Sequence, residues 1–290
     1  MTSRTLHGRY LLLPTSELNA IVIGALARAQ RLYGVRCCSF SFLSNHFHLL
    51  LVVDDAQQLA RFMGYFKSKL AREAGRLYDW KEKIFGRRYD GIVVSGEEAA
   101  QIGRLKYVLA NAVKENLVER LAEWPGAHAV QALLTGEPLE GTWSDRKGKY
   151  LASRRRKGRD SQELTTPETL TLDPLPCWKD LSPEKRRHRV AQLVQEIESE
   201  AAAERKSTGK AALGRAAILA QNPHDHPECP KKSPAPLVHA ASKAVRLEFR
   251  EAYALFVAAY REAVEKLRKG DRAAPFPPGC FPPALPFVGG

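Results

Sequence analysis

Apolar and polar positions along the first 124 residues predict short strands that alternate with amphipathic helices. Apolar residues recur at helical spacing in 15–34 and 56–78, and acidic residues open a further helical segment at 97–121. The segments typical of strands are 9–14, 35–53 and 85–94. The order of these elements indicates an antiparallel or mixed sheet with helices packed on it, and therefore an α+β fold.

Several boundaries can be placed from local residue types. Thr15 or Ser16 can cap the first helix, and Gly34 can close it. Ser44-Asn45 interrupts the apolar stretch 35–53, which predicts a hairpin of two strands with its turn there. The segment 85–94 is expected to be a strand pair or an extended segment around Asp90-Gly91.

The pattern changes after about Trp124. Residues 125–180 are predicted to be a linker, because 141–162 is basic and polar and 165–176 is rich in Thr and Pro. Helical spacing returns in the accessory region 181–270, with expected helices at 181–206, 210–221 and 237–270. The tail, 271–290, contains too many prolines for a helix or an inner strand and is expected to lie extended along a surface.

The charge balance favours a polyanionic partner. The 290 residues include 45 Lys and Arg against 32 Asp and Glu, a net charge of +13, and each phosphate that such a surface neutralises releases counterions. The competing polyanion is a membrane surface, but no run approaches the roughly 18 apolar residues of a spanning helix. The first ten residues lack a secretory core, and five scattered cysteines fit reduced thiols, so a cytoplasmic location is expected.

A pair of histidines carries the clearest chemistry. Alternate side chains of a strand share a face, so His46 and His48 project together while Phe47 and Leu49 enter the core. Two imidazoles one pleat apart can coordinate one divalent ion, although a third ligand must come from elsewhere. The alternative is a strand that carries two solvent-facing histidines with no metal.

A tyrosine on the third predicted helix supplies a candidate nucleophile. Tyr107 and Asn111 are four residues apart and share a helix face, so the Asn111 amide oxygen could complete the metal shell that the Tyr107 hydroxyl faces. Lys114, one turn further on, could contact a phosphate or activate the phenol, which is a poor nucleophile by itself. The alternative is that Tyr107 is a core aromatic residue whose hydroxyl reaches the surface.

Four motifs in series resemble the single-tyrosine HUH transposases of the insertion-sequence 200/605 class, above all their REP-associated branch. They are Asn-His-Phe-His-Leu-Leu-Leu at 45–51, the Phe-Met-x-x-Phe-Lys pattern at 62–67, Gly-Arg-Arg-Tyr-Asp-Gly at 86–91 and Tyr-Val-Leu-Ala-Asn-Ala-Val-Lys-Glu-Asn-Leu-Val at 107–118. The similarity covers residues 5 to about 124, so residues 1–124 are expected to be the catalytic domain.

The resemblance implies a ferredoxin-like antiparallel sheet with packed helices, the HUH endonuclease fold. It also implies that His46, His48 and Asn111 bind Mg²⁺ or Mn²⁺ and that Tyr107 forms a 5′-phosphotyrosine link with single-stranded DNA, at hairpins. The family usually has Asn-Pro-Val where this chain has Asn111-Ala112-Val113. About 165 residues lie beyond the similar region, and they are expected to help recognise DNA or to form a homodimer.

Basic residues expected to contact DNA lie both inside and outside the similar region. They are Lys67, Arg87, Arg88 and Lys114 in the domain and Arg154, Arg155, Arg156 and Lys157 in the polybasic stretch of the linker. The stretch could equally be a solvated linker.

Two other functions remain open from the sequence. The first is a domesticated protein that binds DNA hairpins without cutting them. The second is a metallohydrolase unrelated to DNA, which needs a carboxylate base near the histidines; Asp54 and Asp55 are near in sequence but are expected to cap the next helix. His224-Asp225-His226 with Cys229 lies among prolines and is read as a polar loop rather than a metal site.

Overall fold

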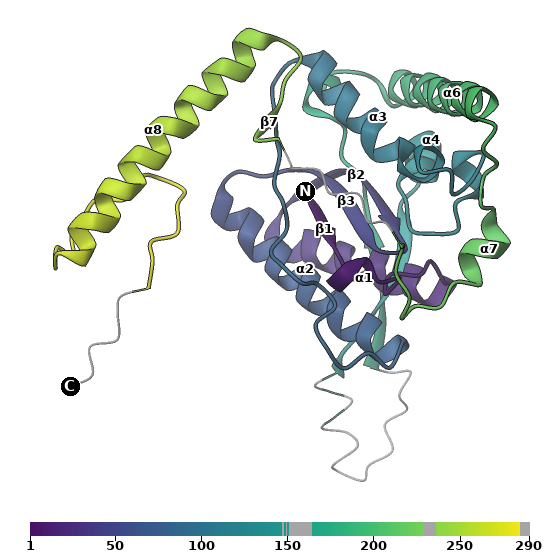
Figure 1. The fold of residues 1–290 in the computed structure, drawn as a ribbon, viewed down its shortest axis with the longest axis horizontal. Coiled ribbons are helices and arrows are strands. Elements are labelled where there is room, and N and C mark those ends of the chain that lie inside the picture. Colours follow the sequence, from purple (N-terminus) through teal and green to yellow (C-terminus); the bar gives the residue numbers. More distant parts are fainter. Residues whose placement is uncertain (147, 149, 151–163, 229–235, 285–290) are drawn as a thin grey trace.

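A small antiparallel sheet with helices on both faces forms the centre of the protein (Figure 1). The computed structural model describes residues 1–146, 148, 150, 164–228 and 236–284. Strands β1 (Thr2–Arg4), β2 (Arg36–Leu43) and β3 (His46–Val52) pair in the order β1-β3-β2. β2 and β3 form the expected hairpin around Ser44-Asn45, and the α+β class predicted from the sequence is confirmed.

Two helices cover one face of this sheet. Helix α1 (Ser16–Tyr33) begins where the Thr15 side chain accepts a hydrogen bond from the Leu18 amide, and it ends at Gly34 in the left-handed conformation. Helix α2 (Ala56–Leu77) is capped by Asp55. Aromatic rings from the sheet and from α2 pack together on this side. They are Phe42, Phe47 and Phe66.

Helix α3 (Glu98–Lys114) packs against β2 and β3. The residues opposite one another in β2 and β3 share a face, so Ser41 lies with His48 while Phe42 lies with Phe47. Because Phe42 and Phe47 face α2, the histidines lie on the face that α3 covers. The helix stops at Lys114, earlier than the predicted 121, because the backbone turns at Asn116, whose φ is +54°.

The strand predicted at 9–14 was wrong. The first strand lies earlier, at Thr2–Arg4, and a 3-10 turn, η1 (Leu6–Gly8), follows it. Leu11, Leu12 and Leu13 are buried, but they lie in a turn rather than in a sheet. These three residues are apolar because they are buried. A short apolar run looks the same in a sequence whether it forms a strand or a buried turn.

The segment 85–94 is extended rather than a strand pair. Asp90 exchanges both backbone hydrogen bonds with Thr2, at 2.9 Å each, on the open side of β1. Strand β4 (Val93–Val94) then pairs in parallel with β7 (Val238–His239), which is far away in the sequence. The edge of the central sheet and the C-terminal part of the chain are therefore joined through this segment.

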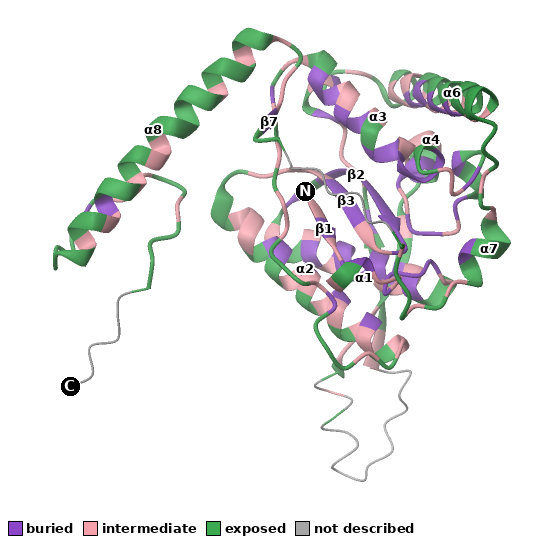
Figure 2. Cartoon of the chain, viewed as in Figure 1, coloured by how far each residue is buried: buried purple, intermediate pink, exposed green. Residues whose placement is uncertain are grey.

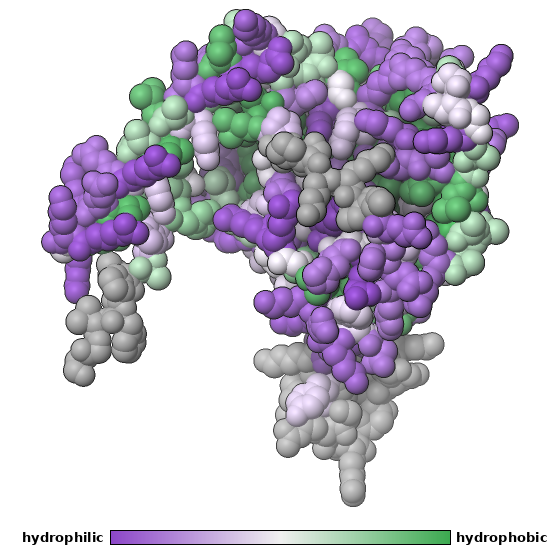
Figure 3. Space-filling view, in the orientation of Figure 1, coloured by the Kyte–Doolittle hydropathy of each residue, from purple (hydrophilic) through white to green (hydrophobic). Residues whose placement is uncertain are grey.

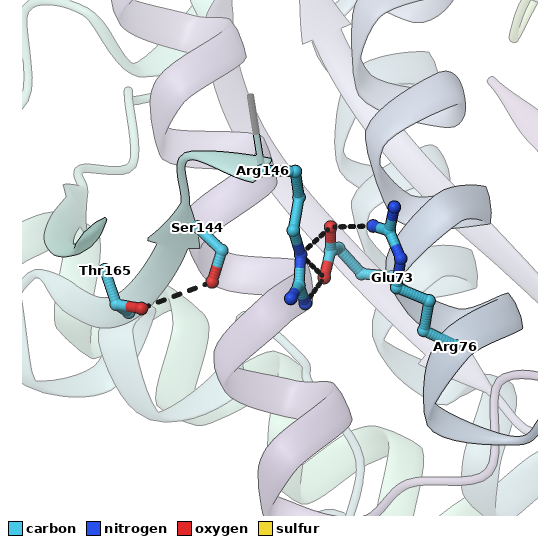
Figure 4. A network of polar contacts seen from close by, with 5 residues as sticks. All are labelled: Glu73, Arg76, Ser144, Arg146 and Thr165. Carbon is cyan, nitrogen blue, oxygen red and sulfur yellow. Dashed lines mark hydrogen bonds and ion pairs between the residues drawn. The ribbon is translucent and has the colours of Figure 1, made fainter. Parts of the chain in front are cut away.

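The predicted linker at 125–180 contains packed secondary structure in its described residues. It includes α4 (Val130–Thr135), β5 (Leu139–Ser144), β6 (Thr165–Leu170) and the 3-10 turn η4 (Pro176–Trp178). Another 3-10 turn, η2 (Leu121–Glu123), precedes it. β5 and β6 pair antiparallel and pack along α1. Arg146, just after β5, forms an ion pair with Glu73 of α2 (Figure 4). These strands contain glycine and many polar residues. Such a composition is also typical of linkers, which is why the sequence predicted one here.

Three helices complete the chain. Helix α6 (Pro183–Thr208) packs on α3 and α4, and α7 (Arg215–Leu219) is shorter than the predicted 210–221. Helix α8 (Lys243–Arg268) extends away from the rest and is exposed over most of its length (Figure 2). The first part of the tail returns along α8, where Phe276 packs on Tyr260. The predicted division into domains at 124, 180 and 270 stays a prediction.

One face of the molecule is mainly polar (Figure 3). Hydrophilic side chains cover most of the face drawn in Figure 3, with hydrophobic ones gathered beside α8 and around α7. Exposed apolar residues in these two places include Leu213, Leu219, Leu247, Tyr253 and Leu255. None of the helices in the described part of the chain has the length and apolar character that crossing a membrane requires.

Candidate functional site

The two histidines of β3 lie side by side, as strand alternation requires. Their ring centroids are 5.1 Å apart and their planes are nearly perpendicular. Arg4 of β1 lies opposite His46, and Thr2 and Ser41 flank His48 on the two neighbouring strands. His48 is 5% exposed. The pair is therefore enclosed by the sheet and by α3, rather than presented to solvent as two independent surface residues.

The two histidines differ in the hydrogen bonding of their Nδ1 atoms. The Nδ1 of His46 lies 2.7 Å from the Asn45 side-chain oxygen. Because that oxygen only accepts, Nδ1 carries the hydrogen, and the Nε2 lone pair is left for a ligand. The Nδ1 of His48 is buried and has no hydrogen-bond partner among the described residues. A buried polar atom without a partner needs an explanation, and coordination of a divalent cation would supply one.

Both imidazoles are held in the neutral form. Burial, followed by the charge of Arg4, lowers the pKa of His46 to about 4. Burial is also the main cause that lowers the pKa of His48 well below its ordinary value, with His46 and Arg104 adding to it. Only a neutral imidazole can donate a lone pair to a metal ion, so both rings are ready to bind one at neutral pH.

Tyr107 lies on α3 directly over this pair. Its ring centroid is 5.4 Å from that of His48, at an interplanar angle of 89°. The side chain is 37% exposed, so the alternative of a core aromatic residue does not describe it. The structure thus brings His46, His48 and Tyr107 together from elements 60 residues apart in the sequence.

Asn111 lies one helical turn beyond Tyr107 and is 5% exposed. Its amide nitrogen donates to the backbone oxygens of Tyr107 at 2.8 Å and Val108 at 3.1 Å. These bonds direct the nitrogen back to the helix, and the amide oxygen accepts no hydrogen bond within the described part of the chain. That oxygen is the atom that a hard divalent cation prefers.

Two imidazoles and one amide oxygen are groups of the kind that bind divalent ions in proteins. Groups of three or more His, Cys, Asp and Glu that could hold a metal are absent from the residues the structure describes. Asp55, which the metallohydrolase alternative would use as a base, instead accepts a hydrogen bond from the Gln58 amide at the start of α2. Asp54 is bound to the Gln58 side chain.

Two cations border the tyrosine ring. The guanidinium carbon of Arg104 is 4.3 Å from the centroid of the Tyr107 ring, and the Lys114 nitrogen is 5.4 Å from it. Lys114 was predicted from the sequence, whereas Arg104 was not. Arg104 precedes Tyr107 by three residues, which is a same-face spacing on a helix and could have identified it.

The other predicted basic residues form a separate cluster. Lys67 donates to the Arg87 backbone oxygen at 3.0 Å and lies 4.7 Å from the Phe85 ring, and burial lowers its pKa to about 8. Arg87 pairs with Asp90, and Arg88 lies over the Tyr89 ring. This cluster of aromatic and basic side chains flanks the edge of the sheet beside β1. Arg154, Arg155, Arg156 and Lys157 lie outside the described residues.

The remaining candidate groups are occupied elsewhere. The hydroxyl of Tyr78 donates to Leu13 at 2.7 Å, and burial raises its pKa to about 12. Tyr65 packs edge-on against Tyr33. His224 and His226 lie near backbone oxygens at 2.8 and 3.1 Å, as expected of a polar loop, while Cys229 lies outside the described residues.

Comparison with models of protein families, with curated proteins and with solved structures gives no match to this chain.

Proposed function

We propose that this protein is a metal-dependent enzyme that nicks and rejoins single-stranded DNA, with Tyr107 as the nucleophile. The observation that carries the proposal is the 5.4 Å separation of the Tyr107 and His48 rings, beside a second histidine and between two cations. The sequence resemblance to single-tyrosine HUH transposases points to the same residues independently of the geometry.

The arrangement of strands supports the fold that this function requires. A ferredoxin-like sheet has a fourth strand beside the first, and the backbone around Asp90 lies at that edge, paired with Thr2. We therefore read the domain as a ferredoxin-like sheet whose fourth strand is reduced to a short extended segment. Ala112 replaces the family's usual proline, and α3 continues through it to Lys114.

His46, His48 and Asn111 would hold the Mg²⁺ or Mn²⁺ ion. When bound, such an ion withdraws charge from a non-bridging oxygen of the scissile phosphate. The Tyr107 oxygen attacks phosphorus while the bond from phosphorus to the 3′ oxygen breaks. The phenol proton leaves to solvent, and the departing 3′ oxygen takes up a proton. The phosphate stays on the protein, so the joining step needs no ATP.

A single strand is the substrate that suits this site. A duplex hides the path of attack on its phosphates, whereas a single strand offers bases that stack on aromatic rings and phosphates that meet cations. The cluster of Lys67, Phe85, Arg87, Arg88 and Tyr89 provides both kinds of side chain at the edge of the sheet. Recognition of a hairpin is inferred from the resemblance.

The test uses a labelled hairpin oligonucleotide in Mg²⁺ or Mn²⁺. We expect a covalent adduct that survives denaturation, and Tyr107→Phe should abolish it because the ring is kept and the nucleophile removed. Tyr65→Phe, which alters a tyrosine packed on Tyr33, is the matched control and should form adduct at the wild-type rate. Undiminished adduct with Tyr107→Phe would move the role to Tyr65 or Tyr89.

His46→Ala separates cutting from binding. Loss of the adduct with hairpin binding retained supports the enzyme. Tight hairpin binding that neither His46→Ala nor EDTA changes, with no adduct from the wild type, would instead establish the alternative of a hairpin-binding protein that does not cleave.

A further inference from the structure

Arg104 is a buried cation without an anion. It is 9% exposed and lies on α3 one turn before Tyr107. Within the described residues its guanidinium forms no ion pair and no hydrogen bond, and its contact is the face of the Tyr107 ring at 4.3 Å. Its five N–H donors have no acceptor among the described residues, and its nitrogens are not fully buried, so a ligand can reach them.

Other cations of the chain, both on α3 and elsewhere, have acidic partners. Lys106, two residues away on α3, pairs with Glu196 and Glu200 of α6. Arg28 and Arg31 of α1 share Glu168. Burial of an unpaired charge is costly, and proteins ordinarily supply a counter-charge or leave the group in water.

The surroundings of Arg104 offer more positive charge rather than a carboxylate. Lys114 lies 5.4 Å from the same tyrosine ring. Arg4 lies opposite His46 in the register of β1 and β3. A small region between β3 and α3 therefore gathers cations around the Tyr107 ring, and Arg104 has no ion-pair partner among the described residues.

We propose that Arg104 binds a phosphate group beside Tyr107. A guanidinium donates two parallel N–H groups to two oxygens of a phosphate, which satisfies the donors and neutralises the charge at once. That the phosphate is the scissile diester of DNA rests on the proposed function. In that case Arg104 holds the group in line with the phenol and stabilises the charge that gathers on its non-bridging oxygens during attack.

The first experiment measures phosphate binding without any reaction. The full chain is melted in EDTA with inorganic phosphate or with chloride at equal ionic strength. At phosphate ten times above its dissociation constant we expect the melting temperature to rise by about 3–6 °C. Arg104→Met should lose this rise, and its melting temperature in chloride should be no lower than that of the wild type, because an unpaired buried charge is removed.

Arg61→Gln is the matched control, since Arg61 is an exposed arginine on α2. It should keep the whole phosphate effect. The inference is overturned if phosphate does not stabilise the wild type or if Arg104→Met keeps the rise in melting temperature. It is also overturned if Arg104→Met melts below the wild type in chloride, because the arginine side chain would then stabilise the fold by its packing.

The second experiment links the site to DNA. In a Tyr107→Phe background, Arg104→Met should reduce the slope of log affinity against log salt by about 1 for a single-stranded oligonucleotide, because it removes the charge. With Tyr107 present, Arg104→Lys should slow adduct formation by about 10²–10³-fold. If phosphate stabilises the wild type but no adduct forms, the proposed function is overturned and the anion site is supported. If adduct forms but phosphate does not stabilise the protein, the anion site is overturned and the proposed function is supported.

Discussion

At the scale of single residues, burial decides the charge of the histidines on this side of the molecule. His46, His48 and His128 all have a pKa lowered by burial, and those of His46 and His128 fall to about 4. His128 lies next to Ser41 of β2, outside the proposed metal set. It therefore reports the effect of burial on stability without interference from a bound ion.

His128 should make the protein less stable in mild acid. The unfolded state has the ordinary histidine pKa near 6.5 and so binds more protons than the folded state between pH 6.5 and 4. The free energy of unfolding is unaffected by His128 above this window and falls as the pH drops through it, by about 2 kcal/mol between pH 7 and pH 5.

Urea unfolding of His128→Gln at both pH values tests this. The variant should lose about 2 kcal/mol less than the wild type between pH 7 and pH 5, because its side chain cannot take up the proton. His188→Gln, at an exposed position of α6, serves as the control. Equal losses in wild type and His128→Gln would show that His128 is charged in the folded protein.

At the scale of elements, α1 and β5 approach so closely that only glycine fits between them. A Cβ added at Gly24 would lie 2.0 Å from the Thr142 backbone oxygen, and one added at Gly141 would lie 2.2 Å from the Gly24 nitrogen. This contact lets the pair β5–β6 lie flat on α1. The residues that resembled a linker are thus held by backbone proximity to a helix of the first domain.

Gly24→Ala should destabilise the protein despite the higher helix propensity of alanine. The clash is with backbone, so α1 and β5 must separate, and we expect a loss of about 2–3 kcal/mol in the free energy of unfolding. Gly64→Ala on α2 is the matched control, because no atom lies within 4 Å of its added Cβ. That variant should gain about 0.5–1 kcal/mol. Urea unfolding of both variants measures these changes. Equal changes in the free energy of unfolding for Gly24→Ala and Gly64→Ala would disprove the close contact.

At the scale of the whole molecule, α8 is attached to the central part of the protein by contacts close to its first residue. β7 pairs with β4, and the Glu97 carboxylate accepts hydrogen bonds from the amides of Ala241 at 2.8 Å and Ser242 at 3.1 Å. Glu97 thereby fixes the point where α8 begins. Hydrogen bonds from Ser95 and then from these amides lower the pKa of Glu97.

Glu97→Ala should loosen α8 without unfolding the core. We expect faster deuterium uptake by residues 238–246 and unchanged uptake by β2 and β3. Glu98→Ala, which removes the pairing with Arg189 of α6, is the control and should leave 238–246 unchanged. In the wild type, the lowered pKa means that this attachment is complete above the ordinary glutamate pKa and is lost as the pH falls through the folded value. Unchanged uptake in Glu97→Ala would show that Glu97 does not hold the start of α8.

Local chemistry was sufficient to predict helices α1, α2 and α3, the hairpin of β2 and β3, and the face that the two histidines share. Alternation in β3 places His46 and His48 on one face, and the caps Thr15, Asp55 and Gly34 depend on neighbours in the chain. Helical spacing predicted that Tyr107 and Asn111 would share a face. These properties follow from backbone geometry over a few residues, so the sequence contains them.

Tertiary structure decided what depends on distant partners. The apolar residues of 9–14 are buried without pairing to a strand, so this segment forms a turn. Part of the predicted linker forms a pair of strands that approaches α1 closely at Gly24 and Gly141. Arg104 is distinguished by the counter-charge it lacks, a property of everything packed around it that no spacing along α3 reveals. Periodicity is local and could be predicted, whereas burial and charge pairing arise only when remote segments meet.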